Sequence, residues 1–165
     1  MRAEGTPYRG LLYAGLMIHG GTVRVVEFNC RFGDPETQAV LRLVDEDLLA
    51  LLKASAGGIL SERAVKFKNQ SSICVVVAAE GYPGDYRKNV PVPSISEQKG
   101  VLVFHAGTVR KDSQIVSTGG RVLGVTAVGS NLLEARDCAY EALGGAGPMP
   151  GLFFRRDIGA RGIRG

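Results

Sequence analysis

Three polar residues at alternate positions of one apolar run could do chemistry together. Residues 25–38 read VVEFNCRFGDPETQ, in which Glu27, Asn29 and Arg31 stand two apart. Side chains at i, i+2 and i+4 of a β-strand share a face, so a strand here would present all three together. Carboxylate and amide oxygens suit Mg²⁺ or Mn²⁺, and a guanidinium can hold a phosphate. The run could therefore form a metal–nucleotide edge, but the spacing alone favours an exposed ion pair between Glu27 and Arg31 on the open face of a hairpin.

The residues that follow favour the site over the ion pair. FGDPETQ places Asp34 where a helix N-cap is preferred and Pro35 where the first helical residue tolerates proline. The start of a helix offers unpaired backbone N–H groups that attract anions. Asp34 and Glu36 add carboxylates at the same edge.

Two strands and two helices should position these residues. The apolar runs on either side of His19-Gly20-Gly21 predict a β-hairpin, since this triplet is a turn signal. The second strand should turn Val26, Phe28 and Cys30 inward. DPETQAVLRLV predicts one helix, and DEDLLALLKAS a second that ends at Gly57-Gly58.

The composition changes after about residue 58. Short β-branched runs follow (SSICVVVAAEGYPGDY, GVLVFHAGTV, SQIVSTGG, RVLGVTAVG), and they predict strands separated by turns. Ser130 should cap a helix over NLLEARDCAYEAL, closed by Gly144-Gly145, and Phe153 and Phe154 should anchor the tail in the core. The order predicts an α+β protein with residues 1–60 as one part and a small, mostly antiparallel module with one or two helices over 61–165.

This second module contains another group of candidate residues. Gly119, Gly120 and Arg121 (TGGR) have the chemistry of an anion-binding turn, because two glycines permit close approach and the arginine adds charge. A Gly-Gly hairpin turn followed by an exposed arginine fits equally well. His105 in FHAGT is interpreted as a strand-end histidine without a catalytic role.

Charge and cysteine content exclude several classes of protein. The net charge is +4 with a pI near 9.1, but no basic run interleaved with aromatic residues appears, so nucleic acid is not an expected partner. Three scattered cysteines predict small buried residues in a reducing compartment rather than a disulfide framework. No apolar run approaches the roughly 18 residues of a membrane span and no signal peptide opens the chain. We expect a cytoplasmic protein.

Several long motifs in one order resemble a known enzyme family. LYAGLMI and VVEFNCRFGDPETQ are similar to the end of the ATP-grasp domain of the glycinamide ribonucleotide synthetases, also called phosphoribosylamine–glycine ligases. AAEGYPGDYRK, VFHAGT, STGGRVLGVTAVG, EARDCAYEAL and FFRRDIG resemble, in order, the C-terminal domain of that family. One departure is Glu80, where the family usually has glycine.

The resemblance implies roles for matching residues. Glu27 and Asn29 fall where the family places its Mg²⁺ or Mn²⁺ ligands on ATP, and Arg31 occupies the catalytic position beside the reacting phosphate. Asp34 and Glu36 lie in the stretch that borders the substrates. The family reaction joins glycine to 5-phosphoribosylamine with ATP, through glycyl phosphate, in purine biosynthesis.

The resemblance also implies that other parts of the enzyme are missing from this chain. It contains no Lys-bearing strand pair for adenine, no Gly-rich lid and no N-terminal α/β domain, so we expect a fragment that is inactive alone. The missing N-terminal part of the same enzyme would then be a partner. The alternatives are a fragment of another ATP-grasp ligase, of the biotin-carboxylase or carboxyaminoimidazole type, or a non-catalytic module that binds anions or a subunit.

Overall fold

The structure is a computed structural model that describes residues 1–61, 64–98 and 100–164. Contacts divide the chain into two compact units, which are described separately. Unit 1 comprises Met1–Thr37 and Val44–Lys68, and unit 2 comprises Gln38–Leu43 and Asn69–Gly165. This division follows Lys68, whereas the sequence suggested a boundary at 60/61. It also assigns residues 38–43, from the first half of the chain, to the second unit.

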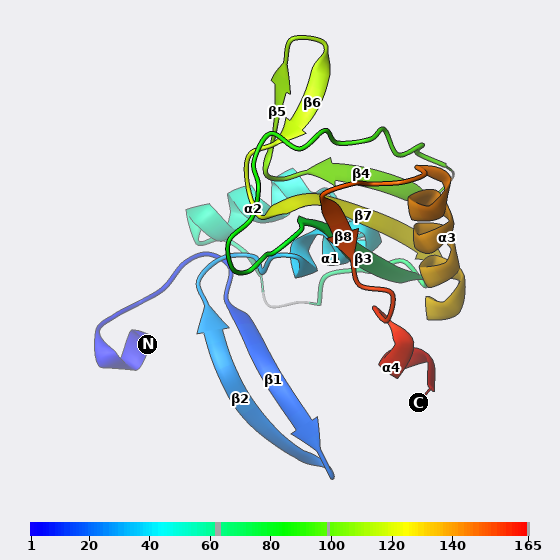
Figure 1. The fold of residues 1–165 in the computed structure, drawn as a ribbon. Coiled ribbons are helices and arrows are strands. Elements are labelled where there is room, and N and C mark those ends of the chain that lie inside the picture. Colours follow the sequence, from blue (N-terminus) through cyan, green and yellow to red (C-terminus); the bar gives the residue numbers. More distant parts are fainter. Residues whose placement is uncertain (62–63, 99, 165) are drawn as a thin grey trace. The chain divides into compact units, whose positions relative to one another are not determined.

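Unit 1 is built on an antiparallel hairpin. Its elements, coloured blue to cyan in Figure 1, are the 3₁₀ turn η1 (Arg2–Glu4), strands β1 (Tyr13–His19) and β2 (Thr22–Asn29), the start of helix α1 (Glu36–Leu43), and helix α2 (Leu48–Gly57). Gly20 and Gly21 both have positive φ, as the predicted tight turn requires. Helix α2 is capped by Asp47, whose side chain accepts from the Ala50 N–H, and it ends at left-handed Gly58, as predicted.

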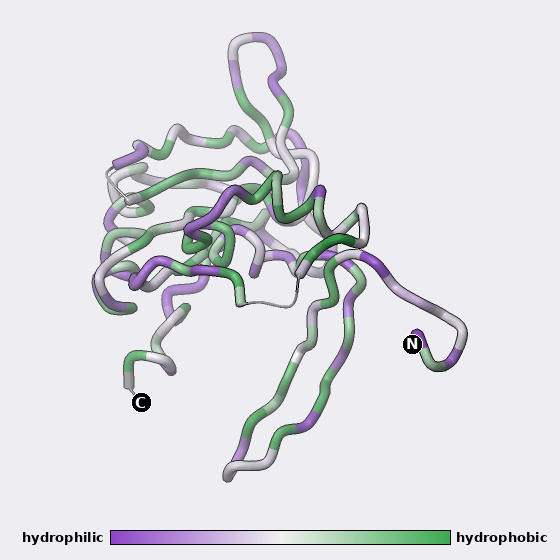
Figure 2. Tube along the Cα trace, turned by 180° about the vertical axis from the view of Figure 1, so that it is seen from behind, coloured by the Kyte–Doolittle hydropathy of each residue, from purple (hydrophilic) through white to green (hydrophobic). Residues whose placement is uncertain are grey.

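The hairpin does not bury the face that the sequence predicted to be inward. Val26 and Phe28 are 66% and 61% exposed, and Cys30 is exposed as well. Figure 2 shows hydrophobic positions along both strands of this hairpin. The prediction that these three side chains pack inward is wrong for this chain, because a two-stranded ladder has no second layer of its own to cover them.

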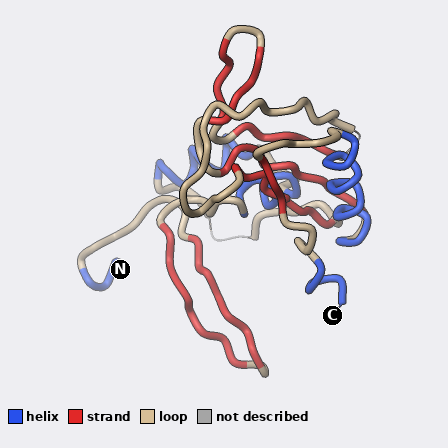
Figure 3. Tube along the Cα trace, viewed as in Figure 1, coloured by secondary structure: helices blue, strands red, loops and turns tan. Residues whose placement is uncertain are grey.

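Unit 2 is organised around a four-stranded antiparallel sheet in the order β4-β7-β3-β8. Its elements, distinguished by type in Figure 3, are β3 (Ser71–Ala79), β4 (Val101–His105), β5 (Thr108–Lys111), β6 (Gln114–Ser117), β7 (Arg121–Gly129), α3 (Leu132–Gly145), β8 (Leu152–Phe154) and α4 (Ala160–Arg164). Ala106 and Gly107 divide the expected GVLVFHAGTV strand into β4 and β5, and β5 forms a separate ladder with β6.

The main core lies on the α3 side of this sheet. The central strands β3 and β7 direct alternate side chains into one cluster with residues of α3. Four of these side chains are 0–2% exposed: Val75, Val77, Leu123 and Val125. The buried residues of α3 are Ala135, Ala139, Ala142 and Leu143. Three of these four are alanines, whose small side chains allow the helix to approach the sheet closely.

The other face of the sheet is covered by residues 38–43 of α1. Arg42 donates to the Thr126 hydroxyl at 3.1 Å and to the Gly100 carbonyl at 3.0 Å, and Ser72 donates to the Ala39 carbonyl at 2.9 Å. Thr126 is fully buried and also donates to the Leu102 carbonyl. Burial lowers the pKa of Arg42, and the Glu97 carboxylate opposes that shift. This helix segment therefore serves as the second layer of unit 2.

Several predicted ends and anchors differ by a residue or two. Helix α3 is capped by Asn131, whose side chain accepts from the Glu134 N–H, rather than by Ser130. It continues through Gly145 to Ala146 instead of closing at the two glycines. Leu152 is the buried residue of β8, Phe154 packs against the core, and Phe153 is exposed.

Two further sequence expectations can be compared with the structure. Cys74 and Cys138 are half-buried, whereas Cys30 is exposed, so only part of the buried-cysteine prediction fits. No helix among residues 1–61, 64–98 and 100–164 has both the length and the apolarity needed to cross a membrane.

Candidate functional site

Glu27 and Asn29 lie together at the end of β2. The Asn29 amide nitrogen donates to Glu27 Oε1 at 2.8 Å, which confirms that the two side chains share a face. The second carboxylate oxygen of Glu27 and the amide oxygen of Asn29 remain as ligands for a cation. In the described part of the chain, no group of three or more His, Cys, Asp or Glu residues could hold a metal alone. The donor set fits Mg²⁺ or Mn²⁺ that takes its other ligands from phosphate and water.

Tyr13 and Gly15 of the opposite strand complete this face. Tyr13 pairs with Asn29 and Gly15 with Glu27, so all four residues belong to one face of the hairpin. A Cβ atom at Gly15 would lie 3.1 Å from Glu27 Cγ, so the glycine leaves room for the carboxylate. The sequence pattern did not predict Tyr13 as a member of this face.

The Tyr13 hydroxyl connects this face to the start of α1. It lies 3.5 Å from Glu36 Oε1. The negative charge of Glu36 raises the pKa of Tyr13, with smaller contributions from burial and from the charge of Glu27. The negative charges of Glu36 and Glu27 thus both disfavour the phenolate form of Tyr13.

Gly33 and Glu36 determine how the loop after β2 enters α1. A Cβ at Gly33 would lie 2.5 Å from Glu36 Oε2, so the carboxylate folds over the glycine. Thr37 also donates its hydroxyl to the Gly33 carbonyl. The helix begins at Glu36 with Pro35 as its N-cap residue. The predicted N-cap role of Asp34 is therefore wrong, because its side chain lies one position too early to cap the helix.

Arg31 lies beyond the strand. β2 ends at Asn29, and Arg31 follows in a bend, where its guanidinium donates to the Phe32 carbonyl at 2.8 Å. Strand alternation therefore does not place it beside Glu27 and Asn29, contrary to the sequence expectation. The alternative, an ion pair between Glu27 and Arg31, is also absent from the residues that the structure describes.

The bend itself is fixed by an aromatic residue from the N-terminal segment. The Tyr8 hydroxyl bridges the carbonyl oxygens of Leu11 and Cys30, at 2.8 and 2.9 Å. Both Tyr8 and the bend belong to unit 1. The main chain next to Arg31 is thus held by contacts within its own unit.

The TGGR turn belongs to unit 2, where its glycines make close contacts. The Gly119 N–H donates to the Gly107 carbonyl at 3.3 Å, and the Gly120 carbonyl accepts from the Ala79 N–H at 2.8 Å. A Cβ at Gly120 would lie 2.2 Å from a ring carbon of Tyr82. Arg121 is half-buried at the start of β7. These contacts give both glycines a structural reason.

The remaining polar residues considered from the sequence mostly contact residues close to them in the chain. His105 Nδ1 lies 3.0 Å from the Thr108 hydroxyl, consistent with a strand-end histidine. The arginines near the C-terminus make their own contacts: Arg155 forms a two-point ion pair with Asp157, at 2.9 and 2.6 Å, and Arg156 stacks on the Phe154 ring. Glu80 is exposed, and its N–H donates to the Gly151 carbonyl.

Comparisons with known proteins identify the family of this chain. The family model "Phosphoribosylglycinamide synthetase, C domain" matches residues 72–161, and "Phosphoribosylglycinamide synthetase, ATP-grasp (A) domain" matches residues 1–37. Phosphoribosylamine–glycine ligase of Leptospira interrogans is 51% identical over 98% of this chain and 38% of its own length. The chain thus spans about two fifths of the length of the curated relatives it matches.

Solved structures show the same relationship. The crystal structure of phosphoribosylamine–glycine ligase from Thermotoga maritima matches with a TM-score of 0.81 and 36% identity, over 94% of this chain and 38% of that one. The biotin carboxylase domain of a 2-oxoglutarate carboxylase matches with a TM-score of 0.60 at 17% identity, over 79% of this chain and 30% of its own, which shows a common fold only. The predicted α+β class is confirmed, and the chain belongs to the phosphoribosylglycinamide synthetase family, whose C-terminal part it matches.

Proposed function

We propose that this chain is the C-terminal part of a phosphoribosylamine–glycine ligase. Residues 1–60 would belong to its ATP-grasp domain and residues 61–165 would form its C-terminal domain. The enzyme would use ATP, with Mg²⁺ or Mn²⁺, to join glycine to 5-phosphoribosylamine in the cytoplasm. The observation that carries the proposal is the Glu27–Asn29 pair on one strand face, at 2.8 Å, inside a segment that matches the ATP-grasp family model.

In this proposal Glu27 and Asn29 hold the metal ion. When bound, the ion would neutralise charge on the ATP phosphates. The Asn29 amide donates to Glu27 Oε1 and would thereby orient the carboxylate, whose other oxygen would bind the ion. Arg31 would stabilise the phosphoryl group in transfer, which requires its side chain to leave the Phe32 carbonyl.

The reaction would proceed in two steps. The glycine carboxylate attacks the γ-phosphorus of ATP, which gives glycyl phosphate and ADP. The amine of phosphoribosylamine then attacks the activated carbonyl, and phosphate leaves with formation of the amide. Asp34, Glu36, Gly119, Gly120 and Arg121 are proposed to border these substrates. Because the chain spans 38% of its relatives' length, we propose that it requires the rest of the enzyme for turnover.

Calorimetric titration of the chain with ADP, with and without Mg²⁺, tests the metal edge. We expect weak binding that needs Mg²⁺ and disappears in Glu27→Gln, because the amide keeps the shape but loses the charge. Glu141→Gln is a matched control, since Glu141 is an exposed carboxylate on α3. If Glu27→Gln binds Mg²⁺–ADP as the wild type does, Glu27 is not a ligand. Ligase turnover by the purified chain would contradict the proposal that it is inactive alone.

A further inference from the structure

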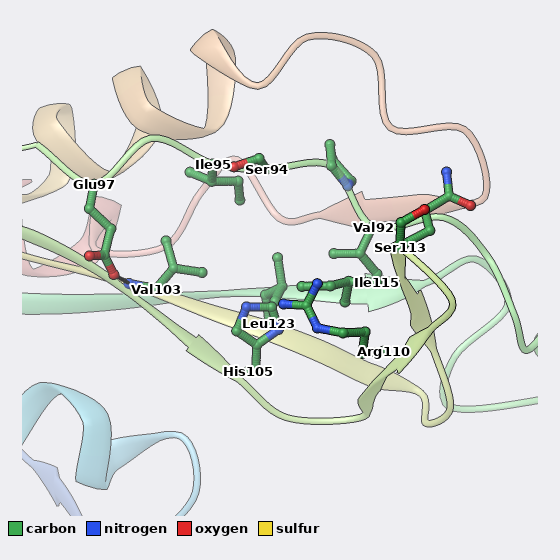
Figure 4. Close-up of a pocket in the computed structure, with 12 residues that line it drawn as sticks. Val92, Ser94, Ile95, Glu97, Val103, His105, Arg110, Ser113, Ile115 and Leu123 are labelled. Atoms are coloured by element: carbon green, nitrogen blue, oxygen red, sulfur yellow. Dashed lines mark hydrogen bonds between the residues drawn. The ribbon is translucent and has the colours of Figure 1, made fainter.

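Unit 2 contains a hollow that none of the proposed roles uses. Its volume is about 500 Å³, within the range of roughly 300–1,000 Å³ typical of small-molecule sites. The floor comes from β4 and β7, where His105 pairs with Leu123. Residues 92–97 form one wall and the β5–β6 ladder forms another (Figure 4).

The walls are held by backbone hydrogen bonds. The Val92 N–H donates to the Ile115 carbonyl at 2.9 Å, and the Val90 and Ser117 main chains pair beside it. Arg110 is directly opposite Ile115 in the β5–β6 ladder, so both side chains face the hollow. The segment 92–97 and the ladder are therefore fixed to each other, and the hollow is a built feature of unit 2.

The hollow combines an apolar floor with a cationic end. Ile95 and Leu123 are 7% and 2% exposed, and Val103 packs against the same core. Arg110 has no ion-pair or hydrogen-bond partner among the described residues. His105 uses Nδ1 toward Thr108, which leaves Nε2 for a ligand. Figure 4 shows Arg110 and His105 at the same part of the hollow.

The one acidic residue of the lining does not neutralise this end. Glu97 Oε1 accepts from the Val103 N–H at 3.0 Å, away from Arg110 in Figure 4. The Glu97 charge also raises the pKa of Arg42 against the effect of burial, so this carboxylate already interacts with another cation. A ligand that binds near Arg110 would therefore meet a positively charged environment.

We propose that this hollow binds a small organic carboxylate with a compact, branched apolar body. The carboxylate would accept hydrogen bonds from the Arg110 guanidinium and His105 Nε2, and the apolar body would lie on Ile95, Val103 and Leu123. A fork of N–H donors matches a carboxylate, and the aliphatic floor favours a ligand that brings apolar surface with its charge. All residues that line the hollow belong to unit 2, whereas the proposed metal–nucleotide edge belongs to unit 1.

Isovalerate is a suitable probe, and its binding can be measured by titrating the chain and recording two-dimensional NMR spectra. Signals from the hollow should shift saturably with isovalerate, less with acetate or inorganic phosphate, and not with the neutral isostere isovaleramide. Arg110→Gln should weaken isovalerate binding about tenfold or more, because it removes a charge-assisted hydrogen bond. Lys111→Gln is the matched control, since Lys111 is the next residue of β5, exposed, and carries the same charge.

Several outcomes would overturn this proposal. Equal binding of isovalerate and isovaleramide would show that the charge is not recognised. Equal weakening by the Arg110 and Lys111 variants would show a general effect of net charge. Stronger binding of inorganic phosphate than of isovalerate would show that the apolar floor contributes nothing. If the wild-type chain gives the well-dispersed NMR spectrum of a folded protein but its signals show no saturable shift with isovalerate, the hollow binds no such ligand.

Discussion

Substitution of Gly120 tests how closely the TGGR turn packs on its neighbours. A Cβ at this position would lie 2.2 Å from Tyr82 Cδ2, 2.8 Å from Tyr82 Cε2 and 3.0 Å from Tyr86 Cε1. Gly120 does not have a positive φ angle, so its backbone conformation is open to alanine. The loss of stability in Gly120→Ala would therefore come from steric overlap alone. Gly120→Ala should therefore destabilise the chain by about 1–3 kcal/mol, the usual cost of overpacking.

The stability is best measured by urea unfolding followed by far-UV circular dichroism, since the chain has no tryptophan. Gly144→Ala provides the control. Gly144 lies in α3 with open space around its Cβ position, so alanine there should stabilise by about 0.5–1 kcal/mol. The two Gly→Ala changes are chemically identical, and the structure predicts opposite signs for them.

A double-mutant cycle with Tyr82→Ala identifies the source of the cost. If the new methyl group collides with the Tyr82 ring, Gly120→Ala should cost about 1 kcal/mol less in the Tyr82→Ala background. Tyr86 remains in contact, so part of the cost should persist. An unchanged urea midpoint for Gly120→Ala, or the same cost with and without the Tyr82 ring, would refute this steric reasoning.

Two further predictions concern hydrogen bonds of unit 2. Arg42→Met should destabilise the chain by about 1–3 kcal/mol in urea unfolding, because the Gly100 carbonyl and the Thr126 hydroxyl each lose a charged donor; an unchanged midpoint would contradict this role. Hydrogen bonds from the Ser130 hydroxyl and N–H lower the pKa of Glu134. The resulting stability is present above the ordinary pKa of a glutamate and is lost as the pH falls through the lowered value. Glu134→Gln should therefore lose less stability in acid than the wild type, and parallel losses in both proteins would argue against it.

The sequence predicted the strand face shared by Glu27 and Asn29 better than the surroundings of that face. Glu27 and Asn29 share a face because strand alternation is strict over two residues, and the Asn29–Glu27 hydrogen bond confirms it. Arg31 lies two residues beyond the end of β2 at Asn29, so strand alternation does not extend to it. A pattern of alternation does not by itself reveal where a strand ends.

Tyr13 was missed because of a β-bulge. Counted outward from the turn, in which His19 pairs with Thr22, Tyr13 would face Phe28. The register shifts between Gly15 and Leu16, so Tyr13 instead pairs with Asn29. A one-residue slip exchanges the faces of a strand, and short-range sequence patterns do not encode such a slip here.

In unit 2, the order and type of the elements followed the sequence, whereas the details depended on tertiary contacts. Ser130 and Asn131 are both good cap residues, and propensity alone does not choose between them. The choice between Phe153 and Leu152 as the core anchor depended on the pairing of β8 with β3. The assignment of residues 38–43 to unit 2 also had no local signal, since it rests on contacts with residues some 30 to 80 positions away in sequence, such as Ser72 and Thr126.

The position of α1 has a consequence for how this protein can be dissected. A cut at residue 60 would retain every strand of the main sheet, and a cut at residue 72, where the matched C domain begins, would remove only Ser71 from β3. Either cut would nevertheless remove residues 38–43, together with the donor that Arg42 supplies to the fully buried Thr126. The excised domain would display a bare sheet face to water. We therefore expect a stable C-terminal domain of this protein to need residues 38–43, which directly follow the segment that matches the ATP-grasp family.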